Sequence, residues 1–195
     1  MLNFYSVFKN LINIFVLLTV FNSFGQTKEY NLVKSQFYDI YTVDKDDVIC
    51  LAKNTTKAKT LIYTFGIWCK PCIKSLPYAI KLAEDYNLDL YVLLLEKEND
   101  KRVIQAIDYL KKIKENINYL VLKDSKYGVK LHNKNKQFLT EITPIDFENI
   151  DDFSKFIIID KTGKVLMVTN WKDKDKSRDT QKMIQNRILP ILSNN

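Results

Sequence analysis

Two cysteines within one short segment are the groups of this chain best suited to chemistry. The segment reads Trp68-Cys69-Lys70-Pro71-Cys72 and lies between an expected strand and an expected helix. At a helix N-terminus, unpaired backbone N–H groups and the helix dipole stabilise a thiolate, so Cys69 is the candidate nucleophile. Cys72 lies one turn further on, within reach of the Cys69 sulfur, as its resolving partner. Lys70 adds a positive charge beside Cys69, and Pro71 fixes the backbone between the two thiols.

The elements around this segment follow from apolar periodicity. Residues 60–65 form a β-branched and aromatic run typical of a strand buried on both faces. Residues 71–86 carry apolar side chains at helical spacing, with Pro71 where its missing N–H costs nothing. The alternation continues with three further elements: a strand over 88–95, a helix over 100–114 and a strand over 119–122.

Two regions are less regular. Residues 37–51 are rich in β-branched and aromatic side chains, and we expect one or two strands at the edge of a sheet. Residues 123–153 begin polar and contain Pro144 within a loop-like stretch, where the sequence predicts neither a regular element nor a domain boundary.

The end of the chain predicts a hairpin and a helix. Residues 155–160 and 164–169 are the two arms of the hairpin, and Gly163 can take the positive φ that the turn needs. A closing helix is expected over 173–192, shortened by Pro190. Strands that alternate with helices imply right-handed parallel crossovers, while the hairpin adds antiparallel pairing. The predicted fold class is therefore α/β, a mixed sheet with helices on both faces.

With these elements in place, the chain resembles the thioredoxin superfamily, and within it the exported thiol:disulfide interchange proteins called TlpA-like or ResA-like. The resemblance covers most of residues 35–193. It rests on the Trp-Cys-x-Pro-Cys segment after a strand, on Pro77 five residues beyond the second cysteine, and on the hairpin sequence Phe-Ile-Ile-Ile-Asp-Lys-Thr-Gly-Lys-Val. It implies a thioredoxin-like three-layer fold, with a mixed central sheet flanked by helices.

The resemblance also implies an exchange mechanism. Reduced Cys69 attacks a substrate disulfide as the thiolate, and Cys72 then attacks the mixed disulfide and releases reduced substrate. No metal or organic cofactor is implied. The expected partners are a disulfide-containing protein substrate and a membrane reductase that restores the dithiol. Trp68 lies beside the dithiol in similar proteins and contributes to the docking surface there; the alternative is a purely packing role for this aromatic ring.

Three positions depart from the family pattern. Tyr63 stands where thioredoxins usually have a buried Asp that serves in proton transfer, and Ser75 stands where the ResA-like subgroup has a Glu. Counting back from Asp160, the position of the family's cis-proline falls on Ser154. Pro144 could occupy that position only if an insertion separates it from the strand, so we favour Ser154. Neither family acid is present, and proton transfer is therefore assigned to no carboxylate.

The N-terminus is typical of an export signal. Lys9 supplies a positive charge ahead of an apolar run over residues 11–21, and small residues precede Gln26. We expect residues 1–25 to be a signal peptide and residues 26–195 the mature thioredoxin-like domain, located in the periplasm or otherwise exported. The alternative is an uncleaved anchor, but the run is shorter than the roughly 20 residues that span a bilayer. No stable membrane insertion is expected after cleavage.

Composition excludes several other classes. The 195 residues suit one ordinary domain, and the net charge of +7 comes from interleaved lysines and acids, so no nucleic-acid partner is implied. Four glycines leave no glycine-rich phosphate loop. Cys50, the remaining cysteine, sits in an apolar run, where a buried inert thiol is the default and a regulatory disulfide the alternative. Zinc would need Cys69, Cys72 and two further ligands, which the chain offers only poorly.

The function expected from the sequence is that of an exported thiol–disulfide oxidoreductase that reduces protein disulfides. Two alternatives stay open. The same fold could donate disulfides as an oxidase or isomerase, because the Lys70-Pro71 dipeptide does not settle the direction of exchange. A non-catalytic binding module is the third hypothesis, since the family acids are missing and the proline position is displaced.

Overall fold

The computed structural model describes residues 32–174 and 178–193. The predicted signal peptide, residues 1–25, lies outside the described residues. No helix in the described part of the chain is long and apolar enough to cross a membrane.

One mixed sheet of seven strands organises the described chain, with the strand order β1-β2-β5-β4-β3-β6-β7. The strands are β1 (Val33–Lys34), β2 (Tyr41–Val43), β3 (Lys59–Phe65), β4 (Asp89–Leu94), β5 (Asn118–Leu122), β6 (Phe156–Asp160) and β7 (Val165–Val168). Strands β2, β5, β4 and β3 run parallel, whereas β6 pairs antiparallel with both β3 and β7. The expected parallel unit and antiparallel hairpin are thus confirmed.

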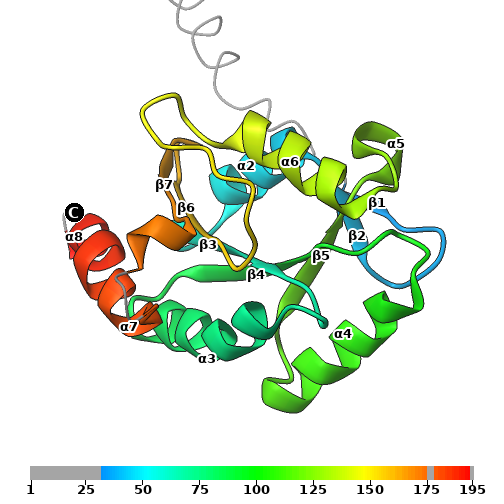
Figure 1. The fold of residues 1–195 in the computed structure, drawn as a ribbon, viewed down its shortest axis with the longest axis horizontal. Helices are drawn as coiled ribbons and strands as arrows, with labels where there is room; N and C mark the ends of the chain where they lie inside the picture. Colours follow the sequence, from blue (N-terminus) through cyan, green and yellow to red (C-terminus); the bar gives the residue numbers. More distant parts are fainter. Residues whose placement is uncertain (1–31, 175–177, 194–195) are drawn as a thin grey trace, which may run out of the picture. The chain divides into compact units, whose positions relative to one another are not determined.

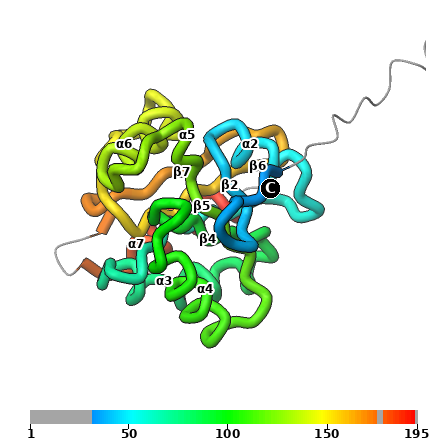
Figure 2. Tube along the Cα trace, turned by 90° about the vertical axis from the view of Figure 1, so that its right-hand side faces the viewer, coloured from blue at the N-terminus to red at the C-terminus, as the bar shows by residue number. Residues whose placement is uncertain are grey.

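Helices cover both faces of this sheet, α2 and α6 on one and α3 and α4 on the other (Figures 1 and 2). The helices are α2 (Lys45–Asn54), α3 (Lys70–Asp85), α4 (Lys101–Ile113), α5 (Asp124–Tyr127), α6 (Leu131–Ile142), α7 (Thr180–Met183) and α8 (Leu189–Ser193). Because strand side chains alternate, Leu61, Tyr63 and Phe65 pack into the core on the α3 face and Ile62 into the core on the α2 face. The predicted α/β class, a mixed sheet flanked by helices, is confirmed.

Of the one or two edge strands expected within residues 37–51, the structure has one, β2, which lies between β1 and β5. Helix α2 begins directly after it. Asp44 accepts the N–H of Asp47 at 3.1 Å, and the Asp47 carboxylate accepts the N–H of Asp44 at 2.8 Å. This reciprocal capping box marks a helix start. Val48 and Ala52, four residues apart, are the buried positions of the helix, so only a narrow apolar stripe marks the helix in the sequence.

Residues 123–153, where no regular element was expected, contain α5 and α6. The stripe of α6 that faces the sheet includes two polar side chains, Lys134 and Asn135, beside apolar ones such as Phe138. Lys134 is buried and forms an ion pair with Asp124. A buried lysine interrupts the apolar periodicity on which sequence prediction relies, and this explains why the helix was missed.

The closing helix starts later than expected and ends later too. Asp179 caps α7 by accepting the N–H groups of Gln181 and Lys182, so the regular helix does not extend back to residue 173. The prediction that Pro190 shortens the helix is wrong, since α8 runs through it. A π-helical stretch, η2 (Ile184–Ile188), directly precedes α8, and such a stretch shifts the hydrogen-bond register ahead of a residue that cannot donate.

The β6–β7 hairpin forms as predicted. Gly163 has φ +84° in its turn, and the Asp160 carboxylate accepts the N–H groups of Thr162 at 2.8 Å and Lys164 at 3.0 Å. A left-handed residue and a side-chain acceptor together close the turn.

Helix α4 allows a test of how a cap contributes to stability. Asp100 accepts the N–H of Arg102 at 3.0 Å and forms an ion pair with its guanidinium. Hydrogen bonds from Arg102 lower the pKa of Asp100 to about 2. Because the folded pKa lies below the unfolded value of about 3.9, the Asp100 contribution is present above about pH 4 and is lost as the pH falls toward 2.

We therefore expect Asp100→Ala to lower the free energy of unfolding by about 1 kcal/mol at pH 7, and the difference from wild type to shrink as the pH falls from 4 to 2. Urea titrations across this range measure it. Asp108→Ala, an exposed change on the same helix, is the control. A deficit of constant size from pH 7 to 2 would contradict the assignment.

Candidate functional site

The two cysteines of the candidate site form a disulfide at the start of α3. Their Cα atoms are 5.2 Å apart. Cys69 is the N-cap of the helix, and its Sγ accepts the backbone N–H of Cys72 at 3.2 Å. Pro71 lies in the first turn, where a residue without N–H leaves no hydrogen bond unmade. The strand, turn and helix expected around the two thiols are the elements observed.

We expect this position to stabilise the thiolate of Cys69 once the disulfide is reduced. The free N–H groups and positive dipole end of α3 face its sulfur, and a hydrogen bond to a charged acceptor is stronger than one to a neutral acceptor. Lys70, on the exposed side of the turn, adds a nearby positive charge. Cys69 is 5% exposed and Cys72 0%, so Cys69 is the less buried of the two cysteines.

Trp68 borders the dithiol on its exposed side. The side chain is 37% exposed, and its ring packs edge to face against Phe153 at 5.0 Å between centroids. Phe153 precedes Ser154 in the loop that leads into β6. Trp68 therefore links the cysteine turn to that loop and still presents apolar surface to solvent, which accommodates both the docking role and the packing role expected from the sequence.

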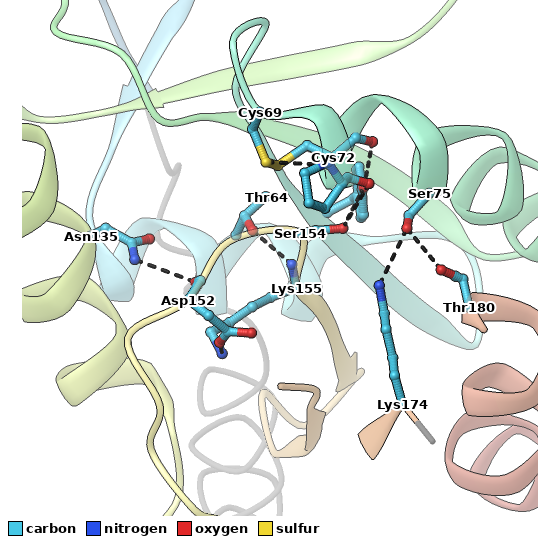
Figure 3. The surroundings of a disulfide bond; sticks show 12 residues. Thr64, Cys69, Cys72, Ser75, Asn135, Asp152, Ser154, Lys155, Lys174 and Thr180 are labelled. Atoms are coloured by element: carbon cyan, nitrogen blue, oxygen red, sulfur yellow. Dashed lines mark hydrogen bonds and ion pairs between the residues drawn. A yellow bond between two sulfur atoms is a disulfide. The ribbon is translucent and has the colours of Figure 1, made fainter. Parts of the chain in front are cut away.

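Ser154, the residue expected from the sequence at the cis-proline position, lies against the cysteine turn. It is buried, has φ +65°, and its Oγ lies 3.5 Å from the carbonyl oxygen of Pro71. The hydroxyl of Tyr63 donates to the carbonyl oxygen of Cys72 at 2.7 Å and lies 2.9 Å from the Ser154 Oγ. Figure 3 shows Ser154 reaching toward this turn from the loop before β6. Tyr63, noted in the sequence only as a departure, is thus part of the site.

Pro144, the alternative to Ser154, lies just after α6 within a turn of its own loop. Its carbonyl oxygen accepts the N–H of Phe147 at 3.0 Å. No peptide bond within residues 32–174 and 178–193 is cis. That Ser154 takes the role of the family's cis-proline remains a prediction, supported by its contact with the cysteine turn.

The loop that carries Ser154 is fixed to the sheet by the residue that follows it. The N–H of Lys155 donates to Thr64 Oγ1 at 2.8 Å, and the Lys155 ammonium donates to the carbonyl oxygen of Thr169 at 3.0 Å. The same buried ammonium pairs with the Asp152 carboxylate. Burial lowers the pKa of Lys155 and raises the pKa of Asp152, and the attraction between the two charges opposes both shifts.

Ser75, at the position of the subgroup's acid, meets hydroxyl and cationic groups instead of a carboxylate. Its Oγ lies 2.9 Å from Thr180 Oγ1, and the Lys174 ammonium donates to it at 3.5 Å (Figure 3). Burial lowers the pKa of Lys174. The first turns of α3 thus face a lysine ammonium.

Sequence reasoning missed a buried carboxyl near Trp68. Glu96, just beyond β4, is fully buried, with the Arg102 Nε 3.3 Å from its Oε2. Burial raises the pKa of Glu96, and the Arg102 charge together with the Trp68 side chain and the Ile67 N–H opposes that rise. The only signal in the sequence was an acid at the end of a continuous apolar run.

Cys50 lies in α2 and is half-buried instead of fully buried. Its Sγ accepts an N–H of Asn54 at 3.2 Å. Across the part of the chain that the structure describes, no group of three or more His, Cys, Asp or Glu side chains is arranged to hold a metal ion.

Comparison with known proteins gives matches among solved structures only: no protein-family model and no curated protein matches the chain. StoA from Bacillus subtilis is 16% identical, with a TM-score of 0.38, over 60% of this chain and 75% of StoA. A thiol:disulfide interchange protein of the thioredoxin family from Chlorobium tepidum is 13% identical, with a TM-score of 0.41, over 72% and 87% of the two chains. A putative protein disulfide isomerase from Bacteroides thetaiotaomicron is 13% identical, with a TM-score of 0.41, over 84% and 88%.

These likenesses are too distant to argue an activity, so the class follows from the chain's own architecture. A parallel β3–α3–β4 unit, an antiparallel β6–β7 hairpin and a closing helix surround a dithiol at the N-terminus of α3. This is a thioredoxin-like α/β fold with a Cys-x-x-Cys pair, as expected from the sequence.

The position of Cys69 at the N-terminus of α3 predicts how fast the two cysteines react in the reduced protein. At pH 7 Cys69 should react with iodoacetamide about tenfold faster than Cys72, because the Cys72 N–H and the helix dipole stabilise the Cys69 thiolate. At about pH 10 ordinary thiols also ionise, so the ratio of the two alkylation rates should fall to the value set by the difference in exposure between the two cysteines. Mass spectrometry of the alkylated peptides measures each rate, with Cys50 as an internal reference. Equal rates for Cys69 and Cys72 at pH 7 would contradict the prediction.

Proposed function

We propose that this protein is an exported thiol–disulfide oxidoreductase that reduces protein disulfides through the Cys69–Cys72 couple. The observation that carries the proposal is the position of Cys69 as N-cap of α3, bonded to Cys72 and accepting its N–H. A sulfur at a helix N-terminus, with a second, more deeply buried cysteine bonded to it, is an arrangement suited to thiol–disulfide exchange.

The reaction balances over two steps. The Cys69 thiolate attacks one sulfur of a substrate disulfide, forms a mixed disulfide and displaces the other substrate sulfur as a thiolate. Cys72, after losing its proton, attacks the Cys69 sulfur, closes the Cys69–Cys72 disulfide and displaces the second substrate thiolate. Two electrons pass to the substrate, and a membrane dithiol donor must return two electrons before the next cycle.

Export rests on the predicted signal peptide, residues 1–25, and the reducing direction on the resemblance to TlpA-like and ResA-like proteins. Disulfide donation is the second candidate, and one observation favours it. Lys70 and Lys174 bring positive charge to the first turns of α3. Charges that stabilise the thiolate form stabilise the reduced protein and make the couple more oxidising.

The reduction potential separates the two directions. For the chain without residues 1–25 we expect a reduction potential of about −270 mV, as suits a reductase supplied by a membrane electron donor. Equilibration in thiol redox buffers followed by alkylation and mass measurement gives the potential. A value near about −120 mV would reverse the assignment to a disulfide donor.

Trapping separates both enzymes from a binding module. Cys72→Ser leaves the attack by Cys69 intact and removes the resolving thiol, so mixed disulfides with substrate proteins should accumulate and should disappear on reduction. Non-reducing electrophoresis of envelope extracts measures them. Cys69→Ser and Cys50→Ser are the matched controls, the first expected to trap nothing. Partner binding that is unchanged in every cysteine variant would favour the binding module.

A further inference from the structure

Two buried hydroxyls connect the sheet and the loop before β6 to the backbone of the second cysteine. Tyr63 lies on β3 and Ser154 lies 91 residues later in the chain, and their oxygens are 2.9 Å apart. The Tyr63 hydroxyl also lies 2.7 Å from the carbonyl oxygen of Cys72. None of these contacts involves a sulfur atom, so what they hold is the peptide unit of Cys72.

Counting protons fixes the direction of this chain of hydrogen bonds. A carbonyl oxygen can only accept, so Tyr63 gives its single proton to Cys72. The Tyr63 oxygen then accepts from Ser154 at 2.9 Å, since the other acceptor near the Ser154 hydroxyl, the Pro71 carbonyl oxygen, is farther away at 3.5 Å. The order is Ser154 to Tyr63 to the Cys72 carbonyl. Burial raises the pKa of Tyr63 far above its ordinary value, so the phenol keeps its proton throughout the pH range of thiol exchange.

The serine at the head of this chain is itself held in place. Ser154 has φ +65°, a conformation that costs energy for a residue with a side chain. Its neighbour Lys155 pairs with Thr64 in both directions, donating to Oγ1 at 2.8 Å and accepting the Thr64 N–H at 3.1 Å. Tyr63 and Thr64 are adjacent on β3, so the buried strand fixes both ends of the connection.

This connection matters most when the disulfide is open. In the oxidised protein the bond to Cys69 already holds Cys72. In the mixed disulfide that bond is absent, and the Cys72 sulfur must stay aimed at Cys69 through its backbone alone. Exchange between sulfurs depends on their alignment, and small losses of alignment slow such a step strongly.

We propose that Tyr63 and Ser154 are positioning residues for the resolving step, holding the Cys72 backbone so that its sulfur attacks the mixed disulfide on Cys69. The inference rests on the proposed exchange function. It also orders the two residues. Loss of the Tyr63 hydroxyl removes the contact with Cys72 outright, whereas loss of the Ser154 hydroxyl removes the support behind Tyr63 and a longer contact, at 3.5 Å, with the Pro71 carbonyl oxygen.

The test separates the two chemical steps in one reaction. The reduced full-length protein carrying Cys50→Ser is mixed with the aromatic disulfide 5,5′-dithiobis(2-nitrobenzoate). Attack by Cys69 forms a mixed disulfide and displaces one coloured thiolate, and attack by Cys72 closes the protein disulfide and displaces the second. Stopped-flow absorbance records the two releases as two phases.

Tyr63→Phe should slow the second phase about tenfold and leave the first within about twofold, since the lost hydrogen bond acts on Cys72 and not on Cys69. Ser154→Ala should slow the second phase about threefold. Tyr127→Phe is the matched control, because that buried hydroxyl accepts the N–H of Lys45 and donates to Glu141 away from the dithiol. Both of its phases should equal those of the Cys50→Ser protein.

The parent protein is the chain that carries only Cys50→Ser. Equal rates of the second phase in the parent, Tyr63→Phe and Ser154→Ala proteins would overturn the inference and leave the proposed exchange function intact. Slowing of both phases to the same extent would also overturn it, because a general loss of structure acts on both. If Tyr63→Phe does not fold, Ser154→Ala alone decides. A parent protein that shows no second release would instead refute the proposed function, and the inference with it.

Discussion

The start of α3 is the constraint on which the rest of the site depends. Everything that gives Cys69 its expected reactivity, the N–H of Cys72, the dipole and the neighbouring sulfur, exists only if the helix begins at that residue. Strand β3 determines where α3 begins, because all seven residues of β3 are buried and its register is fixed by β4 on one side and β6 on the other. A shift of the β3 register by one residue would turn Tyr63 away from the Cys72 carbonyl. It would also move Leu61 and Phe65 to the other face of the sheet.

Buried ion pairs hold the loops around this point. Lys155 with Asp152 fixes the loop that carries Ser154, and Lys134 with Asp124 fixes α6 near the end of β4. Such pairs add little net stability because each charge loses its hydration, but removal of one partner leaves the other charge buried and uncompensated. Their contribution here is therefore to geometry: each loop has one arrangement in which its lysine is paired.

The sequence predicted the elements whose signals are local. Strand β3 and helix α3 follow from apolar runs of the right period, and the dithiol follows from its spacing. Helix α6 was missed because Lys134 and Asn135 occupy core positions, and α2 because only Val48 and Ala52 of it are buried. The contact between Tyr63 and Ser154 joins residues 91 positions apart. Such a contact depends on the pairing of β3 with β6, and this pairing cannot be predicted from a local sequence pattern.

Tyr63 and Ser75 share one feature in the structure. At both positions where similar proteins have an acid, this chain has a hydroxyl, and each hydroxyl has a partner from a distant segment: Tyr63 pairs with Ser154, and Ser75 with Thr180. A buried carboxylate beside the dithiol could take a proton from the second thiol; a neutral phenol with a raised pKa cannot. Tyr63 thus supplies a fixed hydrogen bond and not a titrating group. If Cys72 resolves the mixed disulfide as proposed, it must lose its proton to a group other than Tyr63.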